Sequence, residues 1–220
     1  MQEFIAQILP YGVAVALSPM PIAALLLMLL SNRAKINSVA FTIGWIAGLA
    51  ILVWVVSSLV GLSAGETKQT TDFSMRALID GILGVILILL SIKQWKNRPK
   101  DGQKPATPGW MKTIETFSPA KAFGIGFLLA TVNVKNTPVG IAVGSVISAA
   151  GIAGTSVFIV YLILAGCTIW IPTLGFLVLG QRIESTLTSL KNWLIYNNAT
   201  IMFVLFLILG IMLISKAFGW

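Results

Sequence analysis

Six long runs of apolar residues dominate the chain, and each is long enough, or nearly so, to cross a bilayer as a helix. A helix needs about 20 apolar residues to span the hydrocarbon core. The runs cover 4–30, 39–62, 77–92, 122–152, 154–179 and 197–215. Because lipid offers no hydrogen bonds to the backbone, spanning segments of this kind are helical. The pattern predicts an all-α integral membrane protein with six transmembrane helices.

The composition agrees with this fold class and argues against others. Hydrophobic residues make up 57% of the 220 positions and charged residues 10%, against about a quarter charged in a soluble domain. We therefore expect no nucleic-acid partner, although the net charge is +8. There is no histidine, the single cysteine is Cys167, and no carboxylates are paired. We expect neither an enzyme nor a bound metal or cofactor.

Lysine and arginine are unevenly divided between the predicted loops. Eleven lie in the loops after the first, third and fifth runs, and three lie in the other loops and ends. Basic residues accumulate on the cytoplasmic side of membrane proteins. The distribution predicts a multi-pass protein of the cell (inner or plasma) membrane with both termini outside the cytoplasm.

The chain divides into two halves that we expect to form inverted three-helix repeats. The first covers 1–94 and the second 122–220, and a basic cytoplasmic linker at 95–121 carries an amphipathic interfacial helix near Ile114. A shift of 117 residues places Pro21 on Pro138 and Ser18 on Lys135. Many secondary transporters bind substrate where inverted repeats contribute broken helices. The first and fourth spans are therefore predicted to be discontinuous.

The first predicted break is Leu17-Ser18-Pro19-Met20-Pro21. Two prolines spaced in this way remove two backbone donors and free the carbonyls of the preceding turn. Those carbonyls must face protein, water or a ligand. A simple structural kink remains the alternative explanation for this motif.

The second predicted break is Asn133-Val134-Lys135-Asn136-Thr137-Pro138, in the middle of the fourth run. A lysine at this depth costs at least about 3 kcal/mol on insertion scales, so Lys135 is expected to face a partner, a water-filled cavity or a ligand. Together with a helix N-terminus, the ammonium group would favour an anionic substrate group.

Asp80 is the acidic residue inside an apolar run. It either lies at the outer interface or pairs with Lys135 and carries a coupling proton. Two Gly-x-x-x-Gly pairs begin at Gly44 and Gly140 and favour close helix packing inside the bundle. A homodimer stays open as an alternative.

The motifs resemble the GAP family of Sap or (glyco)lipid-addressing proteins, which belongs to the LysE superfamily of six-span exporters. The resemblance is carried by Pro108-Gly-Trp110-Met111, Ile114, Ser118-Pro119-Ala120, Phe123-Gly124, Gly126 and Asn133-Val-Lys135-Asn136. Ser18-Pro19-Met20-Pro21 is similar to the superfamily's Pro-x-Pro motif. The chain departs from the family's Asn-Pro-Lys-Asn pattern at Val134.

The resemblance implies a membrane protein that moves cell-envelope lipids or other small solutes outward. We expect alternating access at a midplane site that binds a lipid or small, anionic solute. Its predicted residues are Ser18, Pro19, Pro21, Asn133, Lys135, Asn136 and Pro138. An accessory scaffold protein for lipid or envelope assembly is the alternative function. The superfamily's electron carriers need cysteines in both halves, which this chain lacks.

Overall fold

The computed structural model describes residues 2–66, 73–99, 113–114, 116–133 and 136–218, and the regular structure of these residues is helical. The α-helices are α1 (Gln2–Ala16), α2 (Pro19–Leu29), α3 (Ala34–Glu66), α4 (Phe73–Lys96), α5 (Pro119–Thr131), α6 (Asn136–Ala149), α7 (Gly154–Leu179) and α8 (Glu184–Ala217). Short 3-10 helices precede α7 (η2, Gly151–Ala153) and α8 (η3, Gly180–Ile183). The expected all-α class is confirmed for these residues.

Several helices are long and apolar enough to cross a membrane. Two segments of the described chain meet this criterion, Ala34–Leu59 and Gly151–Ala217, and the second contains both α7 and α8. The bent pair α1–α2 provides a third, whereas α5 and α6 are apolar but shorter, with 13 and 14 residues. The last helix starts before the predicted run at 197–215 because the amphipathic residues of 183–194 continue its helical periodicity.

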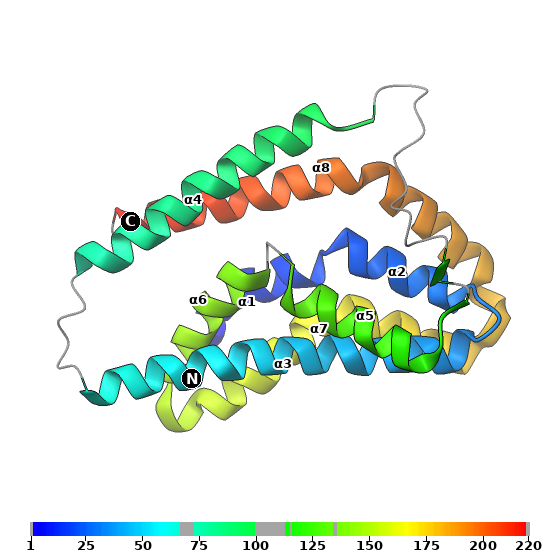
Figure 1. Cartoon of the computed structure of the whole chain (residues 1–220), viewed down its shortest axis with the longest axis horizontal. Helices are drawn as coiled ribbons and strands as arrows, with labels where there is room; N and C mark the ends of the chain where they lie inside the picture. The colour runs from blue at the N-terminus through cyan, green and yellow to red at the C-terminus, as the bar shows by residue number, and fades with distance from the viewer. Residues whose placement is uncertain (1, 67–72, 100–112, 115, 134–135, 219–220) are drawn as a thin grey trace.

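The helices form two groups that α2 connects. Helix α4 packs along α8, while α3 packs against α5, α6 and α7, and α1 packs against α7. Helix α2 contacts both α8 and α3. Figure 1 shows the α4–α8 pair above the remaining helices, with both chain ends on the left and the turns between α2 and α3 and between α7 and α8 on the right.

Glycines bring α3 and α5 into backbone contact. A Cβ on Gly44 would overlap the Phe123 carbonyl oxygen, and one on Gly126 would overlap the Phe41 carbonyl oxygen. Gly140 similarly packs against Leu52 of α3. The Gly-x-x-x-Gly pairs that start at Gly44 and Gly140 therefore lie at helix contacts inside the bundle.

The predicted linker falls largely outside the described residues, which omit 100–112 and 115. Its last part is anchored on α3. Ile114 is fully buried, and the Asn37 side-chain amide donates to the Phe117 carbonyl at 2.9 Å. Helix α5 then begins after Ser118, whose hydroxyl accepts from the Lys121 N–H, and Pro119 occupies the first helical position, where its missing N–H is tolerated.

The α3–α5 contact predicts different effects for two glycines of the same helix. Gly126→Ala forces the two backbones apart and is expected to reduce the free energy of unfolding by about 1–3 kcal/mol. A Cβ on Gly124 would meet no atom of the described residues within 4 Å, so Gly124→Ala is expected to be neutral or slightly stabilising. Denaturant unfolding in detergent micelles measures the free energy of unfolding of both variants. Equal losses of this free energy for Gly124→Ala and Gly126→Ala would contradict the α3–α5 packing.

Candidate functional site

The first helix break lies between α1 and α2, which are inclined by 53°. Ser18 has an extended backbone (φ −84°, ψ 103°) and precedes the first residue of α2. Pro19 and Pro21 therefore fall in the first turn of a new helix, where the N–H groups that proline lacks have no helical partner in any case. The sequence allows this bend at little cost.

Hydroxyl groups pair the carbonyls at the end of α1. The Ser18 hydroxyl donates to the Val15 carbonyl, and the Thr168 hydroxyl of α7 donates to the Ala16 carbonyl. Ser18 is only 2% exposed. Because an unpaired carbonyl in hydrocarbon costs several kcal/mol, these two bonds let α1 end within the bundle.

The second break separates α5 from α6 and is stabilised by an amide. The Asn136 side-chain N–H group donates to the carbonyls of Ala130 (3.0 Å) and Leu129 (3.3 Å) in the last turn of α5. Asn136 is 1% exposed, and its Oδ1 atom has no hydrogen-bond partner among the described residues. In this structure Asn136 connects the two half-helices rather than facing a cavity.

One pocket of about 580 Å³ contains residues of both breaks. The break residues that line it are Ser18, Pro19, Met20, Pro21, Val132 and Asn133. Helices α4, α5 and α8 complete its walls. Four of the predicted site residues, Ser18, Pro19, Pro21 and Asn133, are thus brought together, although they come from opposite halves of the chain.

The other predicted site residues lie elsewhere. Asn136 and Pro138 do not line the pocket, and Pro138 is the third residue of α6. Lys135 and the neighbouring Val134 fall outside the described residues. The structure therefore joins the two predicted motifs through Asn133.

The pocket has walls suited to an amphipathic molecule. Its described lining is uncharged and mostly apolar, and the polar side chains are Ser18, Gln94, Asn133 and Asn198. Leu128 and Val132 on its edge are 53% and 71% exposed, so the opening is apolar. Pockets of this size with a few placed polar groups are typical small-molecule sites.

Asp80 lies away from the pocket and forms an ion pair with Lys216. Its Oδ2 atom is 3.4 Å from the Lys216 Nζ atom, and the two side chains are 20% and 58% exposed. At a rise of 1.5 Å per residue, Asp80 is roughly 20 Å along α4 from Gln94. The pair joins the start of α4 to the end of α8.

Three residues that the sequence pattern did not single out contribute to this region, namely Gln94, Thr168 and Asn198. Gln94 is close to Lys93 and Lys96, so it resembles a loop residue at the end of a span. Asn198 directly follows another asparagine near the start of a span, and Thr168 is one hydroxyl within an apolar run. Their roles depend on helix packing, which no local sequence signal encodes.

The bonds of Asn136 predict a stability effect. Asn136→Ala leaves the carbonyls of Leu129 and Ala130 without this donor and is expected to lower the free energy of unfolding by about 1–3 kcal/mol. Thr137→Val removes the long, exposed hydrogen bond (3.5 Å) from the adjacent hydroxyl to the Asn133 carbonyl and is expected to stay within about 0.5 kcal/mol of the parent chain. Chemical unfolding followed by circular dichroism compares them; no difference between the two variants would refute the capping role.

Comparisons with known proteins identify the family. The family described as Sap, sulfolipid-1-addressing protein, matches residues 8–219. Searches of curated proteins and of solved structures find no match. The family match spans both helix breaks, the pocket and every described helix beyond the first turns of α1. With its apolar helices, this chain is a membrane protein, and it belongs to the Sap, sulfolipid-1-addressing protein family.

Proposed function

We propose that this protein is a membrane transporter of the LysE superfamily type that exports a cell-envelope lipid or small solute by alternating access. The observation that carries this proposal is the pocket lined by residues of both helix breaks. The family is described as sulfolipid-addressing, which supports a lipid as the transported molecule. We propose no catalytic step and no cofactor.

Inverted repeats are supported by the positions of the two breaks. The same shift of 117 residues that places Pro21 on Pro138 also carries Pro19, the first residue of α2, onto Asn136, the first residue of α6. The helix after each broken pair packs on the other half: α3 contacts α5, and α7 contacts α1. We propose six spans, with α1–α2 and α5–α6 each counted as one discontinuous span.

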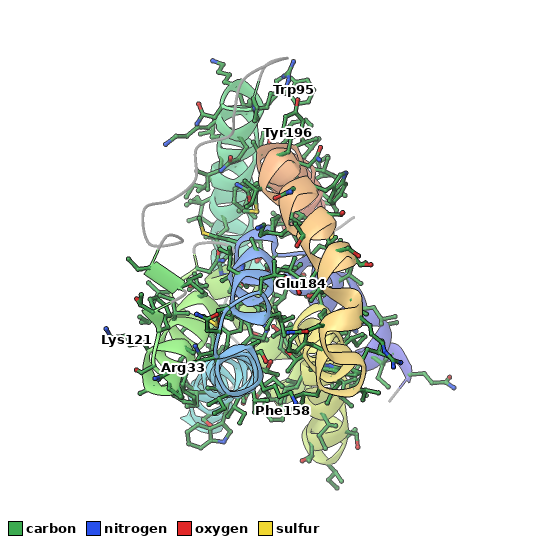
Figure 2. All side chains as sticks on the ribbon, turned by 90° about the vertical axis from the view of Figure 1, so that its right-hand side faces the viewer. Arg33, Trp95, Lys121, Phe158, Glu184 and Tyr196 are labelled. Atoms are coloured by element: carbon green, nitrogen blue, oxygen red, sulfur yellow. The ribbon has the colours of Figure 1, made fainter. Side chains whose placement is uncertain are left out.

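The proposed orientation rests on the basic residues at one end of the molecule. The turns on the right of Figure 1, between α2 and α3 and between α7 and α8, contain Arg33 and Arg182. Figure 2 views the molecule from this end and shows Arg33 and Glu184 at it. By the positive-inside rule this end faces the cytoplasm, and the two termini then lie outside.

Alternating access requires the pocket walls to separate on one side at a time. The α4–α8 pair forms one wall, and the broken helices form another. Half-helices that end inside a membrane can change their inclination without breaking a continuous hydrogen-bond ladder. Lys135 is outside the described residues, and its binding of an anionic group stays a prediction.

Accessibility of the pocket from the two membrane faces tests this function. In a Cys167→Ala background, Asn133→Cys is expected to react with a membrane-impermeant thiol reagent added from either side of oriented vesicles. The reason is that a transporter exposes the same site alternately to both faces. Labelling is quantified by mass spectrometry.

Ala130→Cys is the matched control because Ala130 is fully buried one helical turn earlier. It is expected to stay unlabelled from both faces. Reaction of Asn133→Cys from one face alone, or from neither, would contradict alternating access and favour the accessory scaffold function.

A further inference from the structure

The pocket has a second polar wall that belongs to neither helix break. Gln94 of α4 and Asn198 of α8 line it together with Ser18 and Asn133. Leu90 precedes Gln94 by one helical turn, and Met202 and Phe206 follow Asn198 at intervals of four residues, all on the pocket lining. Each helix therefore presents one continuous face to the pocket.

An aromatic contact fixes Gln94 and Asn198 on the same structural unit. The rings of Trp95 on α4 and Phe203 on α8 have centroids 4.8 Å apart, and the Arg98 guanidinium carbon lies 3.5 Å from the centre of the Trp95 ring. Figure 2 shows Trp95 where α4 ends beside α8. The last turn of α4 is thus held against α8, next to the pocket.

The unit formed by α4 and α8 is joined to the remaining helices through few elements. Among the described residues, the extensive packing of α4 is with α8, and α8 reaches the other helices chiefly through α2. Ser18 and Asn133 belong to the broken helices. The polar groups of the pocket therefore come from two groups of helices, which α2 connects.

The chemistry of the lining defines the ligand. Gln94 and Asn198 are half-exposed on the pocket lining, and their carboxamides each offer donors and an acceptor without charge to a molecule in the pocket. A ligand that satisfies both functions of an amide carries hydroxyl groups, which also donate and accept. Leu128 and Val132 at the exposed edge would contact an apolar chain.

We propose that Gln94 and Asn198 are head-group-binding residues that hydrogen-bond the hydroxyl-bearing head of a membrane lipid, opposite Asn133. The lipid chain leaves the pocket over Leu128 and Val132 into the bilayer. A bound head group therefore connects the α4–α8 pair to the broken helices. This inference rests on the proposed transport function and names the residues that select its substrate.

Photo-crosslinking tests the inference on the full chain in phosphatidylcholine nanodiscs. The probe is a glucosyl diacylglycerol with a diazirine on one acyl chain, and the comparison probe has its glucose hydroxyls methylated. We expect at least about tenfold less labelling with the methylated head, because it cannot donate to the amide oxygens. Gln94→Met and Asn198→Leu, which keep side-chain size, are each expected to reduce glucosyl-lipid labelling about five- to tenfold.

Asn197→Leu is the matched control for Asn198→Leu. The Asn197 amide donates to the Trp193 carbonyl within α8 at 2.9 Å, and the residue does not line the pocket. Its labelling is expected to equal that of the parent chain. Circular dichroism of each variant verifies that the helices are retained.

Three results would overturn the inference: equal labelling by both probes, equal losses for Asn197→Leu and Asn198→Leu, or full competition by free glucose, which would indicate a soluble sugar ligand. The proposed function fails separately. One-sided reaction of Asn133→Cys alongside the expected lipid labelling would remove alternating access and leave the binding residues assigned. Reaction of Asn133→Cys from both faces, without selective labelling by the glucosyl lipid, would support alternating access and remove the assignment of Gln94 and Asn198.

Discussion

The arrangement of this protein depends on one constraint, that a helix ending inside hydrocarbon must have its terminal carbonyls paired by another group. The chain meets this requirement at both breaks with side chains. Ser18 and Thr168 hydroxyls pair the carbonyls of Val15 and Ala16, and the Asn136 amide pairs two carbonyls of α5. Because these four carbonyls are paired within the protein, the two helix ends can lie in the bundle without a permanent ligand.

At the second break, the neighbouring residues Asn133 and Asn136 have different structural roles. Asn133 lies between the end of α5 and Asn136, and it lines the pocket that Asn136 does not reach. The two asparagines of one motif thus have different positions, one at the cavity and one at the helix junction. In the proposed transporter, a substrate that contacts the Asn133 side chain would leave the bonds of the Asn136 amide to α5 in place.

Part of this organisation could be predicted from the sequence, because prolines and polar residues inside apolar runs have direct backbone consequences. The spacing of Pro19 and Pro21, and the run ending at Pro138, placed both breaks correctly. Hydropathy also predicted the helices, although α8 starts earlier than its apolar run. A side-chain amide can bind a ligand or pair a backbone carbonyl. The residue type alone therefore could not show that Asn136 pairs carbonyls of α5.

The contributions of Gln94, Thr168 and Asn198 could not be predicted, since they arise where distant helices meet. Their neighbours in sequence are ordinary for the end or interior of a span. The ion pair of Asp80 with Lys216 likewise depends on the packing of α4 along α8. Long-range packing decides which polar residues face the pocket, and a single sequence contains little information about it.

Amide hydrogen exchange in lipid nanodiscs is the measurement that tests the account most directly. Peptides containing Leu17–Ser18 and Val132–Asn133 are expected to exchange measurably faster than peptides from the middle of α3 and α7, because a helix break beside an open pocket admits water. Exchange at both breaks as slow as in α3 and α7 would show two continuous, sealed helices and would contradict the account.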